Sequence, residues 1–206
     1  MRRAGAPLAV ALPALLLVAP LRQWIESRML LHMLLEFPLL LLAGWCAARW
    51  WLGRPRARPM LRITRMLDWH GWTTLTLVSS VALVWMLPSA LDAALLWPAL
   101  NLGKLASWWL AGWLLAGAWR RIDPELVLFF LGNLAWMTAT AGLLYLDAPA
   151  RLCVNYLQDD QRHAGIGLVL LAVLLGVLAI VRAVAEGGAS PGTAPAQPQC
   201  APGRRS

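Results

Sequence analysis

Apolar residues in this chain of 206 residues gather into blocks about as long as a membrane-crossing helix. The clearest blocks cover residues 29–51, 126–146 and 164–184. A helix needs roughly 20 apolar residues to cross a hydrocarbon layer ~30 Å thick, whereas the strands of a membrane barrel alternate between apolar and polar residues. Uninterrupted blocks of this length therefore predict an all-α, polytopic transmembrane helical bundle.

Three further apolar blocks bring the predicted number of spans to about six. They cover residues 6–20, 72–87 and 102–119. The first block is also short enough to be the core of a signal peptide. We interpret it as an uncleaved span because no clean small-x-small cleavage site precedes Leu21. Together the blocks define a single transmembrane helical domain, residues 1–186.

Charged residues between the blocks predict which side of the membrane each connection faces. Positive charge concentrates in cytoplasmic connections, and the arginine-rich segments here are residues 2–3, 49–65, 120–121 and the segment from Arg182 onward. The alternate connections, residues 22–28, 88–104 and 147–163, hold five of the ten acidic residues and are assigned to the outer side. Both termini are then cytoplasmic. The net charge of +8 is explained by this orientation, so no nucleic-acid partner is expected.

The last residues of the chain have a different composition from the apolar blocks. After Glu186 the sequence is rich in Gly, Pro, Ala, Ser and Gln. Such a segment has too little apolar surface to offset the entropy of ordering a chain. We predict that residues 187–206 form a disordered cytoplasmic tail.

A polar stripe enters the second block from its outer end. Arg28, His32 and Glu36 are spaced four residues apart, with Met29 and Met33 beside them. Residues four apart share one face of a helix, and Glu36 would lie roughly 10 Å deeper than Arg28 at 1.5 Å per residue. A carboxylate at that depth needs a partner, water or a proton. The stripe either fixes helix packing or forms part of a functional site.

A second polar segment precedes the sixth block on the same predicted side. Asp160 and His163 are three residues apart, so they become neighbours if the helix begins by Asp160. An aspartate at a helix start is also ordinary capping chemistry. Gly165 and Gly167 would allow another helix to approach closely. His70, in contrast, is assigned to the opposite side and is interpreted as an interfacial residue.

The two polar segments together contain the donor types of a metal site. The candidate ligands are His32, His163, Met29, Met33, Glu36 and Asp160. Imidazole combined with thioether suits copper, and thioether suits Cu(I) in particular. In this hypothesis the two carboxylates orient or neutralise the site. Two histidines on facing helices also suffice to ligate a b-type haem, which stays open as an alternative.

The same two segments resemble motifs of a known family. The stretch MLLHMLLEFPLLLLAG, residues 29–44, and the stretch DQRHAG, residues 160–165, are similar to motifs of the CtaG-type cytochrome c oxidase assembly factors. The likeness covers about a quarter of the chain. Arg28 stands where the family has the first histidine of a pair, and Ala164 stands in place of a glycine.

The resemblance implies a bacterial inner-membrane assembly factor for a haem–copper oxidase that handles copper at the outer face. Its expected partners are membrane lipid and either oxidase subunits or another copper chaperone. Two alternatives remain: a non-catalytic membrane scaffold or respiratory-complex subunit, and a b-haem-binding redox subunit. The sequence contains no nucleophile elbow, phosphate-binding glycine loop or His-Glu-x-x-His pair, so we do not expect an enzyme.

Overall fold

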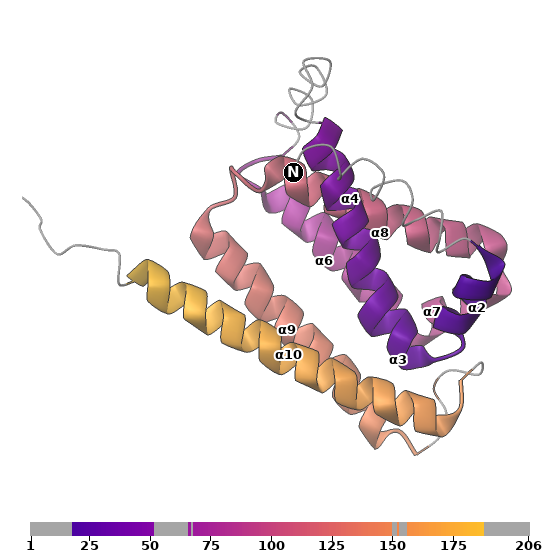
Figure 1. Cartoon of the computed structure of the whole chain (residues 1–206). Coiled ribbons are helices and arrows are strands. Elements are labelled where there is room, and N and C mark those ends of the chain that lie inside the picture. The colour runs from indigo at the N-terminus through magenta and orange to yellow at the C-terminus, as the bar shows by residue number, and fades with distance from the viewer. Residues whose placement is uncertain (1–17, 52–65, 67, 150–151, 153–155, 188–206) are drawn as a thin grey trace, which may run out of the picture.

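The computed structural model describes residues 18–51, 66, 68–149, 152 and 156–187, and every regular element in these ranges is helical (Figure 1). The elements are α2 (Ala19–Glu26), α3 (Met29–Leu31), the π-helical turn η1 (His32–Glu36), α4 (Phe37–Trp51), α6 (Trp72–Met86), α7 (Pro88–Leu96), α8 (Pro98–Ala118), α9 (Pro124–Asp147) and α10 (Gln158–Gly187). The all-α prediction is confirmed. Most of the first predicted span and the tail from residue 188 lie outside the described residues.

Three of the described helical segments are long and apolar enough to cross a membrane. They are Met29–Trp51, Pro124–Asp147 and Gln158–Ala185. A fourth is added if α6 and α7, which meet at a bend of 76°, count as one broken span. Helix α8 occupies the place of the fourth predicted span, but it is not among these segments. The helices indicate a membrane protein, and the number six stays a prediction.

Prolines lie in the first turn of four of the described helices. Pro20, Pro88, Pro98 and Pro124 lie in the first positions of α2, α7, α8 and α9. Proline is favoured there because the first N–H groups of a helix have no partner within the helix. The segment 88–104, predicted to connect two spans, is helical and contains α7 and the first two turns of α8. Its place outside the membrane stays a prediction.

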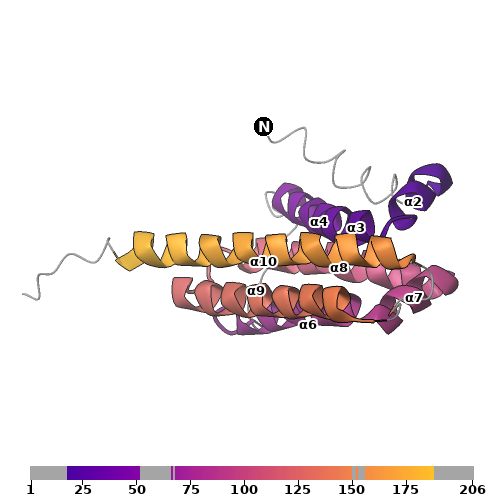
Figure 2. The ribbon, with the colours of Figure 1, turned by 90° about the horizontal axis from the view of Figure 1, so that it is seen from below.

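Two pairs of helices make up most of the bundle. Helix α4 crosses α8 where glycines face each other's backbones: a Cβ added at Gly44 would overlap the Trp109 carbonyl, and one added at Gly112 would overlap the Leu41 carbonyl. Helices α9 and α10 form the second pair, seen side by side in Figures 1 and 2. The two pairs are joined through neighbouring elements. Helix α10 contacts α3 and η1, which lead into α4, and α9 contacts α6, which packs against α8. Beyond its contact with η1, α10 diverges from α4 (Figure 1).

Candidate functional site

His32 and Glu36 lie in a π-helical turn near the start of the second apolar block. The turn η1 separates α3 from α4, and both side chains are buried, with exposed fractions of 0% and 3%. Proline at position 38 lacks the N–H group that would bond to the Leu34 carbonyl in a regular α-helix, which favours a changed hydrogen-bond pattern here. Single π-turns within helices occur frequently at functional sites.

Lys104 extends from α8 to these two side chains. It is fully buried, and its Nζ lies 2.9 Å from Oε1 of Glu36 and 2.9 Å from Nε2 of His32. A third contact, of 3.5 Å, joins Nζ to Oε1 of Glu26 at the end of α2. Asn101, one turn before Lys104 on α8, donates from Nδ2 to the same Glu26 oxygen at 3.1 Å. A buried charge is stable only when it is paired and hydrogen-bonded, and Lys104 meets that condition.

The other ring nitrogen of His32 contacts Tyr156. The distance from Nδ1 to the Tyr156 Oη is 2.8 Å, and Tyr156 is 3% exposed. A lysine ammonium has only donors, so the Nε2 atom accepts from Lys104. It follows that Nδ1 carries the proton and donates to Tyr156. We call Glu26, His32, Glu36, Asn101, Lys104 and Tyr156 the His32 cluster.

Aromatic rings cover the inner side of the cluster. Phe37 meets the His32 ring edge-on, with centroids 5.6 Å apart, and stacks on Trp108 of α8 at 4.9 Å. Phe37 and Trp108 are themselves nearly fully buried. The rings separate the charged groups from the apolar interior between α4 and α8.

Gln161 fixes the segment that carries Tyr156. Its Nε2 donates to the Tyr145 carbonyl at 3.1 Å, and its Oε1 accepts from the Leu152 N–H at 2.8 Å. The side chain thereby joins the end of α9, the following connection and the start of α10. Gln161 belongs to the second motif behind the family resemblance, and it is 2% exposed.

The glycines after Gln161 bring α10 against its neighbours. A Cβ at Gly165 would lie 2.9 Å from the Gly142 carbonyl oxygen on α9, and one at Gly167 would lie 2.8 Å from Cδ2 of Leu34 in η1. The prediction that these two glycines permit close helix approach is confirmed.

His163 is not part of the cluster. It lies on the exposed side of α10, where its Nδ1 donates to the Asp159 carbonyl at 2.7 Å. Asp159 and Asp160 occupy the first turn of α10, a place where negative charge is favoured by the helix dipole. The prediction that Asp160 and His163 lie within one helix is confirmed, but this pair is separate from His32.

The remaining predicted residues have different surroundings. Met29 and Met33 are buried in the apolar core. Arg28 is the exposed N-cap residue of α3, so the predicted stripe contains only His32 and Glu36. Among the residues that the structure describes, no group of three or more His, Cys, Asp or Glu side chains could hold a metal ion. The six predicted ligands are thus not gathered in one place.

Four cluster members were missed by sequence reasoning: Glu26, Asn101, Lys104 and Tyr156. Lys104 was assigned to a connection because it lies near the start of an apolar block. A usable signal was present, since Asn101 and Lys104 are three residues apart in a segment that opens with a helix-starting proline. No sequence pattern around Tyr156 indicated that it would contact His32.

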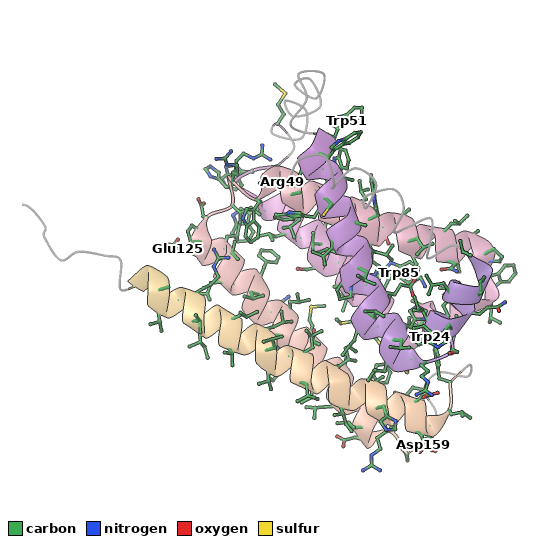
Figure 3. All side chains as sticks on the ribbon, viewed as in Figure 1. Trp24, Arg49, Trp51, Trp85, Glu125 and Asp159 are labelled. Atoms are coloured by element: carbon green, nitrogen blue, oxygen red, sulfur yellow. The ribbon has the colours of Figure 1, made fainter. Side chains whose placement is uncertain are left out.

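A second, partly buried ion pair lies away from the cluster. Asp68 accepts from the Thr74 N–H at 3.1 Å and from Nη2 of Arg121 at 3.3 Å, which fixes the start of α6 to the connection between α8 and α9. His70 pairs with Asp123 at 3.8 Å, and both are more than half exposed. Figure 3 shows the two ends of the molecule: Trp24 and Asp159 mark the end with the cluster, and Arg49 and Trp51 lie at the other end of α4.

Comparisons with known proteins add no relative. No protein-family model matches the chain, and neither a curated protein nor a solved structure matches it. The sequence and structure define a protein whose described elements are all helical. Some of these helices are long enough to cross a membrane, and a histidine with a nearby carboxylate is buried among them.

Proposed function

We propose that the protein is an assembly factor for a haem–copper oxidase in the bacterial cytoplasmic membrane. The observation that carries the proposal is that the helical segments carrying the two motifs behind the family resemblance contact each other, since α10 contacts α3 and η1. His32 of the first motif contacts Tyr156, 124 residues away in the chain, and Gln161 of the second motif fixes the segment on which Tyr156 lies. The first motif thus supplies members of the His32 cluster, and the second motif holds the segment that carries another member, which supports a shared role for the two motifs.

The surface of α9 and α10 supports a role among other membrane proteins. Large apolar side chains are exposed along these helices: Leu143, Leu144, Leu170, Val173, Leu174, Val177, Ile180 and Val181. Such a surface is suited to hydrocarbon rather than water. In the proposal it contacts membrane lipid and the spans of an oxidase subunit during assembly.

The His32 cluster does not fit a copper ion with the side chains as they stand. A metal ligand must offer a free lone pair, but Nε2 of His32 accepts from Lys104 and Nδ1 contacts Tyr156. A copper ion would also be repelled by the buried ammonium. We therefore assign no copper step to this cluster, and copper handling by the chain stays a prediction of the sequence.

A membrane scaffold is the second candidate, favoured by the mutual contacts of the cluster. Lys104 bonds to groups from α2 and η1, and the contact of Tyr156 with His32 joins the segment before α10 to η1. A cluster with these contacts would serve to hold helices together. In this alternative the protein supports a respiratory complex without acting on its metal centres.

Deletion of the gene from its source bacterium tests the proposal. We expect membranes of the deletion strain to lose most cytochrome oxidase activity, because the oxidase is not matured. Wild-type protein and the matched control His163→Ala should restore activity, whereas His32→Ala should not. Normal oxidase activity in the deletion strain contradicts the proposal. Normal activity combined with a destabilised respiratory complex supports the scaffold.

A further inference from the structure

We infer that the His32 cluster is a cation-binding site whose occupant is the protein's own Lys104 ammonium. The inference rests on the contacts within the cluster and does not depend on the proposed function. It predicts that the folded protein needs no metal ion at this place. It also predicts that the site accepts a free primary ammonium ion once the lysine is removed.

The groups around Nζ are of the kinds that bind cations. Two are carboxylate oxygens, from Glu36 at 2.9 Å and Glu26 at 3.5 Å, and one is the imidazole nitrogen of His32 at 2.9 Å. Carboxylate and imidazole are also the donors that bind divalent metals. The three groups come from α2 and η1, whereas the cation comes from α8. The donors and the cation are thus supplied by separate helices that pack together.

Covalent attachment makes Lys104 a strong competitor for this site. A tethered group has a high effective concentration at a site within its reach, and a lysine ammonium is a compact charge on a flexible stem. Lys104 is fully buried, so its stem also fills the space between α8 and η1. A free cation must displace both the charge and the stem.

The wild-type protein offers a direct test through nitrogen-15 NMR of histidine. The chain has three histidines, and the exposed His70 and His163 serve as internal references. If Lys104 donates to Nε2, His32 is the neutral tautomer protonated on Nδ1, and a Lys104→Met variant changes its Nε2 shift. A His32 protonated on Nε2 overturns the inference.

Metal titration of the same protein, purified without a histidine tag, is the second readout. Addition of Cu(I), Cu(II) or Zn²⁺ should leave the His32 signals unchanged. Stoichiometric metal binding that is lost in His32→Ala overturns the inference. It would leave the oxidase proposal intact, because that proposal is tested by oxidase activity in cells.

Chemical rescue tests the ammonium site itself. Lys104→Ala removes the atoms of n-propylamine, so n-propylammonium is the matching probe. We expect a lowered melting temperature for Lys104→Ala in detergent and a saturable rise on addition of n-propylammonium. Neutral 1-propanol should have no such effect, and Lys104→Met, whose side chain fills the space, should not respond.

Two results would contradict the ammonium site. One is a melting temperature of Lys104→Ala that does not respond to n-propylammonium. The other is an equal rise with 1-propanol, which would indicate filling of space rather than recognition of charge. If Lys104→Ala does not fold, NMR of the wild-type protein still tests the inference, because it shows whether His32 is protonated on Nδ1 or on Nε2.

Discussion

His32 and His163 lie on helical segments that contact each other, yet their surroundings are opposite. His32 is fully buried and bonded through both ring nitrogens, whereas His163 is exposed and bonded only within its own helix in the described contacts. Their neighbours explain the difference. Ala164, Gly165 and Gly167 form the side of α10 that packs against other helices, and His163 lies on another face. Proximity of two helices therefore does not bring together every side chain near their ends.

The largest effect is expected from removing the cation of the buried cluster. Lys104→Met leaves buried carboxylates without their ammonium, and the loss of one partner of a buried ion pair costs about 3–5 kcal/mol. Unfolding in detergent, followed by circular dichroism, measures the change. Arg162→Met, at an exposed position of α10, is the control and should have little effect. A loss below about 1 kcal/mol for Lys104→Met, well under the range for buried pairs, would show that the pair is unimportant.

The second-largest effect on stability is expected from His32→Ala, and the same substitution at His163 should have almost none. His32→Ala orphans the hydrogen-bonding groups of Lys104 and Tyr156 and leaves a cavity, so a loss of about 3 kcal/mol is expected. His163→Ala should change the stability by less than about 0.5 kcal/mol, as is usual for surface substitutions. The same unfolding measurement applies to both. Equal losses of stability for the two variants would contradict the difference in burial between His32 and His163.

Glycines on α10 test the packed face that separates the two histidines. A Cβ at Gly165 meets the Gly142 carbonyl oxygen at 2.9 Å, whereas a Cβ at Gly176 meets nothing within 4 Å. Gly165→Ala should therefore destabilise the protein by about 2 kcal/mol through overpacking. Gly176→Ala, on the same helix, should be neutral or slightly stabilising, because alanine favours helix. Thermal unfolding of both variants decides whether α10 packs as described.

The smallest effect is expected from Tyr156→Phe. This variant removes the acceptor of the His32 Nδ1–H and keeps the ring, so a loss of about 1 kcal/mol follows from a single buried hydrogen bond. The His32 nitrogen-15 signals should shift at Nδ1 and remain unchanged at Nε2. A shift confined to Nε2 would contradict the contact between Nδ1 of His32 and Tyr156.

Much of the fold followed from the apolar blocks, because helix length and composition are properties of the local sequence. The need of Glu36 for a partner also followed, since a carboxylate within an apolar block is costly when unpaired. The spacing of His32 and Glu36 predicted that they share one helical face, and Nε2 of His32 and Oε2 of Glu36 lie 3.5 Å apart.

The identity of the main partner could not be predicted in this way. Lys104 is far from Glu36 in the chain, and the crossing of α4 and α8 that joins them depends on backbone contact at Gly44 and Gly112. The orientation of His163 depended likewise on which face of α10 packs. Both are properties of helix packing, which a single sequence does not specify.

The π-helical turn at η1 has a consequence for how insertions and deletions act on this chain. Each residue of an α-helix turns the chain by about 100°. A π-turn takes up one extra residue, so the residues that follow are rotated by about that amount relative to an unbroken α-helix of the same sequence. Gly44 lies eight residues after Glu36 and reaches α8 with this rotation included. Loss of one residue from the turn, with a return to a regular α-helix, would therefore keep Gly44 on the side of α4 that faces α8. A return to a regular α-helix without that loss would turn Gly44 away from α8.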